Sequence, residues 1–229
     1  MKKNTLLVLV CLNVVLVFID SFELRAQVIA APSIKASAEK LDLSDFRGSV
    51  YLDDNFQQGT IYDELTGQEK NKWIRYNVLD DVFEIKQTEN STNIEVLKKT
   101  YEIFVEIKNK RFYFRNYIDK QGNNITGYVE KIAESKENEF CIKYAKELTM
   151  PQKAQTSLEQ DLPGKIKDDS YYLVGKGNEL KPAEIDKKNI YTFFSEEKTA
   201  KLKAYVKEHR LKFRDTDDIK KLVDYSESL

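Results

Sequence analysis

Alternation of apolar and polar residues between positions 101 and 118 places the strongest constraint on the fold of this chain. Apolar residues occupy alternate positions before the turn, at Tyr101, Ile103, Val105 and Ile107. After the turn, Phe112, Phe114 and Ile118 lie on the matching face. A period of two is that of a β-strand, whose successive side chains point to opposite faces of the sheet. The segment therefore predicts an antiparallel hairpin that turns near Asn109-Lys110 and buries one apolar face.

The reverse face of this hairpin is amphipathic. It carries Phe104, Tyr113, Arg115 and Tyr117. On one interpretation, Phe104, Tyr113 and Tyr117 line an apolar cavity and bind a ligand. On the other, the same face is packed beneath the C-terminal helices. The sequence leaves both alternatives open.

A second hairpin is predicted over residues 73–86, with Asp80-Asp81 as its two-residue turn. This register pairs Asn77 with Glu84, and the apolar face then holds Ile74, Tyr76, Val78, Phe83 and Ile85. Arg75 and Asn77 lie on the opposite face and are candidates for binding a ligand. The alternative is a diagonal salt bridge from Arg75 to Glu84, with Asn77 satisfied nearby.

Short β runs continue to about residue 185, and helical patterns follow. Residues 149–170 are polar and predict a surface loop. After residue 186 we expect a short helical segment through residue 194, a helix over 196–209 capped by Ser195, and a last helix capped by Asp215 or Thr216. The fold class is thus α+β. An antiparallel meander over 48–185, forming a curved sheet or partial barrel, carries the C-terminal helices of 186–229 on the same domain.

The N-terminus has the three parts of a secretory signal peptide. Lys2-Lys3 precede an apolar run from Leu6 to Ile19, and Ala26 marks the predicted cleavage point. The run is shorter than the roughly 20 residues that a bilayer requires. We therefore expect residues 1–26 to be removed and residues 27–47 to form a leader. The mature protein would be periplasmic or secreted, with no transmembrane segment.

Composition excludes several chemistries. Cleavage removes three of the 37 basic and two of the 38 acidic residues, which leaves a net charge of −2 and no basic excess for nucleic acid. Cys141 would be the only cysteine of the mature chain, and His209 is the only histidine. Zinc sites use clustered Cys and His, so we predict no metal, no cofactor and no catalytic residue. We interpret Cys141 as a buried thiol and His209 as a helix-end residue.

The segment Gly48–Phe56, followed by Gly59-Thr60-Ile61 and Arg75-Tyr76-Asn77, resembles a group of secreted proteins from the Bacteroidota. That group shows the pattern GSxYL(N/D)xxFxxGx(I/V), then RYN, and closes with a Lys-rich helix pair like residues 198–229 here. Asp53-Asp54 stand where the group often has Asn. The resemblance implies export and a β-then-α order, and it brings no catalytic residues to this chain.

Together these observations predict an exported, non-enzymatic binding or interaction protein of the bacterial envelope. Its partner would be another envelope protein or an apolar ligand. A periplasmic carrier of a lipid-like ligand, held in a cavity lined by residues such as Phe104 and Tyr117, is the first alternative. A hydrolase that uses two carboxylates is the second, because a glycosidase needs such a pair across a cleft.

Overall fold

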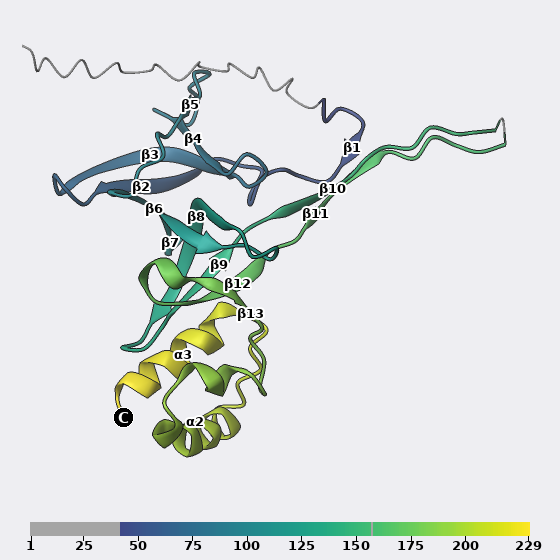
Figure 1. The fold of residues 1–229 in the computed structure, drawn as a ribbon. Helices are drawn as coiled ribbons and strands as arrows, with labels where there is room; N and C mark the ends of the chain where they lie inside the picture. The colour runs from purple at the N-terminus through teal and green to yellow at the C-terminus, as the bar shows by residue number, and fades with distance from the viewer. Residues whose placement is uncertain (1–41, 157) are drawn as a thin grey trace, which may run out of the picture. The chain divides into compact units, whose positions relative to one another are not determined.

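The computed structural model describes residues 42–156 and 158–229, and Leu43–Leu229 form one compact unit (Figure 1). The predicted signal peptide and the leader up to residue 41 lie outside the described residues. The end of the predicted leader is not free of structure, because β1 (Phe46–Arg47) lies within it and pairs in parallel with a later strand.

Ten strands form one continuous sheet in the order β13-β12-β9-β8-β7-β6-β2-β3-β4-β5, and every neighbouring pair is antiparallel. Their bounds are β2 Gln57–Asp63, β3 Gln68–Asn77, β4 Val82–Lys86, β5 Glu95–Val96, β6 Ile103–Ile107, β7 Lys110–Ile118, β8 Asn124–Glu134, β9 Glu139–Lys143, β12 Tyr171–Gly175 and β13 Lys181–Ala183. Two α-helices follow the sheet, so the predicted α+β class is confirmed.

The β6–β7 hairpin has the predicted faces and a turn one residue earlier than expected. Lys108 and Asn109 form the two-residue turn, with φ of 49° and 63°. Positive φ at both central positions is the type I′ geometry that matches the twist of paired strands. Val105 therefore lies opposite Phe112, and both side chains are buried.

The β3–β4 hairpin is shifted by two residues from the predicted register. Asn77 pairs with Val82 rather than Glu84, and Arg75 lies directly opposite Glu84. The connection thus spans four residues, 78–81, instead of two. A shift of two residues returns every side chain to its original face. For that reason the predicted apolar face was correct although the register was wrong.

The large sheet curls so that its distant strands meet. Four strands separate β4 from β8 in the sheet, yet the rings of Phe83 and Tyr128 are 4.7 Å apart, edge to face. Strands so far apart in the hydrogen-bonding order can touch only if the sheet bends back on itself. The enclosed core contains Ile61, Ile74, Tyr76, Val78, Phe83, Val105, Phe112 and Tyr128.

Asp81, in the β3–β4 connection, ties this curl together. Its Oδ1 accepts a hydrogen bond from Lys143 Nζ of β9 at 2.6 Å, and its Oδ2 accepts one from the Tyr128 backbone N–H of β8 at 3.2 Å. Tyr76 donates its hydroxyl to the same carboxylate. Gly127 leaves room for the group, since a Cβ there would lie 2.5 Å from Asp81 Oδ2. Burial lowers the pKa of the Lys143 ammonium, while the Asp81 charge opposes that shift.

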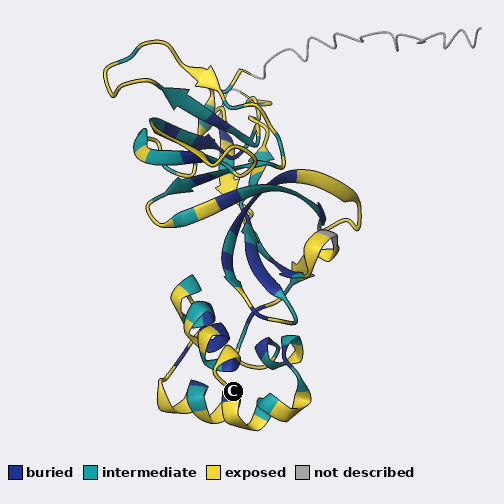
Figure 2. Cartoon of the chain, turned by 90° about the vertical axis from the view of Figure 1, so that its left-hand side faces the viewer, coloured by how far each residue is buried: buried dark blue, intermediate teal, exposed yellow. Residues whose placement is uncertain are grey.

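The C-terminal helices cover β8, β9 and β12. A 3-10 turn, η2 (Ile190–Phe193), leads into α2 (Glu196–Glu208), and α3 (Thr216–Glu227) closes the chain. Asp215 caps α3, as predicted, by accepting from the backbone N–H groups of residues 217 and 218. Figure 2 shows buried residues along the curved strands and on the helices. The second core joins Ile132, Phe140, Val174, Leu202, Val206, Ile219, Leu222 and Val223, among others.

Residues 146–156 and 158–168, together defined here as the arm, contradict the predicted surface loop over 149–170, because strands form at both ends of this stretch. β10 (Lys146–Thr149) and β11 (Gly164–Asp168) pair in antiparallel register, and β1 joins the other side of β11. The connecting residues continue this two-stranded ribbon outward, away from the sheet and the helices (Figure 1).

Candidate functional site

Arg75 lies at the centre of a cation–aromatic sandwich. Its guanidinium carbon is 3.7 Å from the centroid of the Tyr51 ring and 4.4 Å from that of Phe56. Its Nη2 donates to Glu84 Oε2 at 2.6 Å, and its Nη1 donates to the backbone oxygen of Asp54 at 3.0 Å. The planar guanidinium therefore fastens residues 49–56, named here the strap, onto β3 and β4.

The strap is also held by backbone bonds. Leu52 N–H donates to the Tyr76 oxygen at 3.1 Å, and Val78 N–H donates to the Val50 oxygen at 2.9 Å. Asn77 is buried, and its amide exchanges two hydrogen bonds with Asp80 in the adjoining turn. The polar groups of Arg75 and Asn77 are thus engaged within the chain. This geometry favours the salt-bridge alternative over ligand binding for both residues.

Phe104 and Tyr113 belong to a ladder of stacked rings on the outer face of the sheet. Tyr62, Phe104 and Tyr113 lie on three adjacent strands, with ring centroids 4.5 Å and 5.1 Å apart and interplanar angles of 9° and 25°. Each face of the Phe104 ring is therefore covered by a neighbouring ring. The rings stabilise the strand pairing.

Tyr117 is located elsewhere. It is buried in a separate cluster with Val129, Cys141, Leu173 and Leu180. The core beneath the C-terminal helices contains none of Phe104, Tyr113 and Tyr117. The structure thus brings Phe104 and Tyr113 together and separates them from both Tyr117 and Arg75.

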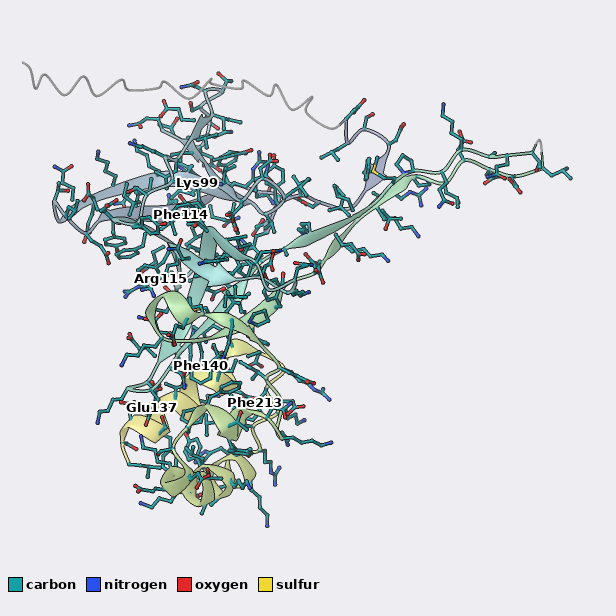
Figure 3. All side chains as sticks on the ribbon, in the orientation of Figure 1. Lys99, Phe114, Arg115, Glu137, Phe140 and Phe213 are labelled. Carbon is teal, nitrogen blue, oxygen red and sulfur yellow. The ribbon has the colours of Figure 1, made fainter. Side chains whose placement is uncertain are left out.

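The arm is the feature that the sequence interpretation missed. It exposes three large apolar side chains: Met150 at 56%, Leu158 at 95% and Leu162 at 58% of their surface. Gln152 and Leu162 exchange backbone hydrogen bonds of 2.9 Å and 2.8 Å across the ribbon. Figure 3 shows side chains of the arm pointing into solvent on both sides. An available signal was the alternation Lys165-Ile166-Lys167 within the polar stretch.

Cys141 lies in β9, and His209 directly follows α2. Cys141 is buried, and burial raises the pKa of its thiol to about 12. His209 is exposed at the end of α2, where its ring lies 4.1 Å from that of Tyr205. Among residues 42–156 and 158–229, no cluster of His, Cys, Asp and Glu side chains is arranged to hold a metal ion.

The buried thiol makes stability fall at alkaline pH. An unfolded thiol ionises near pH 9.0, whereas the folded one stays protonated until about pH 12. Above pH 9 unfolding thus releases a proton, and the free energy of unfolding decreases as pH rises. At pH 10.5 this contribution is about 2 kcal/mol. We expect the free energy of unfolding, measured with urea, to fall less between pH 8 and pH 10.5 in Cys141→Ala than in the natural chain. Equal falls in the two proteins would contradict the raised pKa of the Cys141 thiol.

No protein family, curated protein or solved structure compared with the chain matches it. Of the helices in the described part of the chain, none combines the length and the apolar character needed to cross a bilayer.

Proposed function

We propose that the chain is an exported, non-enzymatic interaction module of the bacterial envelope that contacts a protein partner through its arm. The observation that carries this proposal is the projecting ribbon with Met150, Leu158 and Leu162 exposed. Export is supported by the signal-peptide pattern of residues 1–26.

A two-stranded ribbon that projects into water gains little stability from its own contacts. Isolated hairpins are marginally stable, because too little apolar surface is buried to offset the entropy of ordering them. The arm nevertheless continues beyond the strands that support its base, and it presents apolar side chains to solvent. Burial of exposed apolar side chains against another protein would be favourable, so these side chains suit a surface that binds a partner. Lys153, Glu159 and Asp161 near the tip give this surface charges of both signs.

The two alternatives have less support. A carrier requires one cavity lined by rings such as Phe104 and Tyr117, which the fold places in different clusters. A pocket does lie between the strap and β7, lined by Leu52, Ile74, Tyr76 and Phe112 among others. Its volume of about 270 Å³ is below the usual range for sites that enclose a ligand. Asp53 is paired with Lys108 at 2.8 Å, and the residues that line this pocket include no second carboxylate to complete the pair that a hydrolase would use.

Site-specific photo-crosslinking in the native envelope tests the proposal. We expect a photoreactive residue at Leu158 to form one defined protein adduct. The same residue at Leu65, which is 79% exposed in the β2–β3 turn, should form none. Adding Leu162→Asp should weaken the adduct about tenfold, since a buried Leu contributes about 1.5–3 kcal/mol. Mass spectrometry of the crosslinked protein should show that its chain begins at Gln27.

Equal labelling from Leu158 and Leu65 would contradict the proposal, because it would mean that exposure alone determines the contacts. A product that retains Met1 would contradict export.

A further inference from the structure

A polar groove lies on the outer face of the sheet, away from the arm. Its volume is about 520 Å³, and it crosses β2, β3 and β6 at the β6–β7 turn. Its lining is Gln58, Gly59, Thr60, Asn71, Lys72, Trp73, Gln87, Glu106, Lys108 and Asn109. Four of these ten residues carry a carboxamide, and one is the only tryptophan of the chain.

Two of the carboxamides are oriented by their neighbours. Thr60 donates its hydroxyl to Asn71 Oδ1 at 2.8 Å, and Lys72 donates its ammonium to Gln87 Oε1. Each carbonyl oxygen thus already accepts one hydrogen bond, which fixes the orientation of the amide and leaves its NH₂ group as a donor. Within the described part of the chain, the side-chain amides of Gln58 and Asn109 have no hydrogen-bond partner. The groove therefore offers oriented donors beside amides that can both donate and accept.

Trp73 supplies an aromatic surface to the same groove. It is half-buried and lies opposite Gln58 on β2 and Lys86 on β4. An indole face carries negative charge density and attracts the weakly positive C–H groups of a ligand. Its N–H has no partner among the described residues. A ligand that combines C–H faces with hydroxyl groups would satisfy both properties.

Two of the three charged residues that line the groove are paired with an opposite charge within the chain. Lys108 pairs with Asp53 at 2.8 Å, and Glu106 pairs with Arg111 at 2.7 Å. Lys72 is held by the amide of Gln87. An anionic ligand would have to compete with these partners, whereas a neutral ligand would not.

We propose that this groove binds a neutral oligosaccharide, with one sugar ring on Trp73 and its hydroxyls bonded to Gln58 and Asn71. Planar carboxamides can donate and accept at once, which suits adjacent hydroxyls. The groove and the arm share no residues, so binding at one does not depend on the other.

The single tryptophan makes the test specific, because all indole fluorescence of the folded chain comes from Trp73. The full chain is titrated separately with maltohexaose, cellohexaose and N-acetylglucosamine hexamer up to about 10 mM, which covers weak binding. We expect at least one sugar to change the emission saturably. Asn71→Ala and Gln58→Ala should each weaken that binding about fivefold, as the loss of one hydrogen bond predicts.

The matched control is Tyr101→Ala, an exposed aromatic residue outside the groove, which should bind like the natural chain. Circular dichroism melting curves identify any variant that fails to fold. Trp73→Ala should abolish binding measured by calorimetry. The proposal is overturned if no sugar gives a saturable change, if binding survives in the Asn71 and Gln58 variants, or if inorganic phosphate binds more tightly than the sugars.

Discussion

Replacing Asp81 by Asn should destabilise the chain by about 3 kcal/mol, the usual cost of removing one partner of a buried ion pair. The side chain of Lys143 is only 9% exposed, and Asp81 is its only carboxylate partner within 4.0 Å in the described part of the chain. Asn retains the shape of Asp and tolerates the positive φ of 53° at this position. The decrease in unfolding free energy would therefore reflect the missing negative charge, and urea unfolding measures this decrease.

The pH dependence of this variant gives an independent check. Without Asp81, burial should lower the pKa of Lys143 further in the folded chain. The Lys143 amine then binds a proton more tightly in the unfolded chain than in the folded one. The stability deficit should then shrink as pH rises toward the ordinary lysine range. Asp169→Asn, in the exposed pair with Lys120, is the matched control and should cost less than about 1 kcal/mol. Equal losses for Asp81→Asn and Asp169→Asn would show that the buried pair does not hold the curl.

Replacing Arg75 by Leu should release the strap and cost about 3 kcal/mol. The change removes two ring contacts and leaves Glu84, whose side chain is 16% exposed, without its partner. Hydrogen exchange should accelerate at the amides of Leu52 and Val78, which bond the strap to β3 and the following turn. Mass spectrometry or NMR can measure this exchange together with the change in unfolding free energy.

Two further arginine variants separate charge from geometry. Arg75→Lys keeps the charge but loses the planar fork, so it should retain only part of the stability. Arg111→Leu removes an exposed arginine that also pairs with a glutamate and lies 5.9 Å from the Phe104 ring. It should cost less than about 1 kcal/mol. A smaller loss for Arg75→Leu than for Arg111→Leu would contradict the role of the sandwich.

The sequence predicted faces better than registers. Ile74, Tyr76, Phe83 and Ile85 were assigned to the buried side because alternation depends only on parity, which a shift of two residues preserves. The length of the connection depends instead on backbone geometry at Asp81, which alternation does not report. The arm was misread for a related reason. β10 and β11 have four and five residues, and the paired Leu148 and Ile166 are their only half-buried large apolar side chains, so the apolar alternation is too short to stand out in the polar stretch.

The candidate sites were harder to predict than the fold. The salt bridge from Arg75 to Glu84 was one of two alternatives for this arginine, and it joins residues that lie directly opposite rather than diagonally. The rings of Tyr51 and Phe56 come from a strap whose path no local pattern specifies. Trp73 was interpreted only as a strand residue. Its proposed role depends on amides from β2 and the β6–β7 turn, which become neighbours only after the strands pair. Proximity of this kind arises from the tertiary fold.

The tie between Asp81 and Lys143 also constrains the order in which the chain can assemble. The two residues are 62 positions apart, whereas each hairpin joins positions that are near neighbours. Closing so long a segment has a larger entropic cost, so the hairpins should form first and the sheet should close late in folding. Until then, Phe83 and Tyr128 lack the contact that buries their rings, and a chain whose sheet has not yet closed is prone to aggregate during that interval.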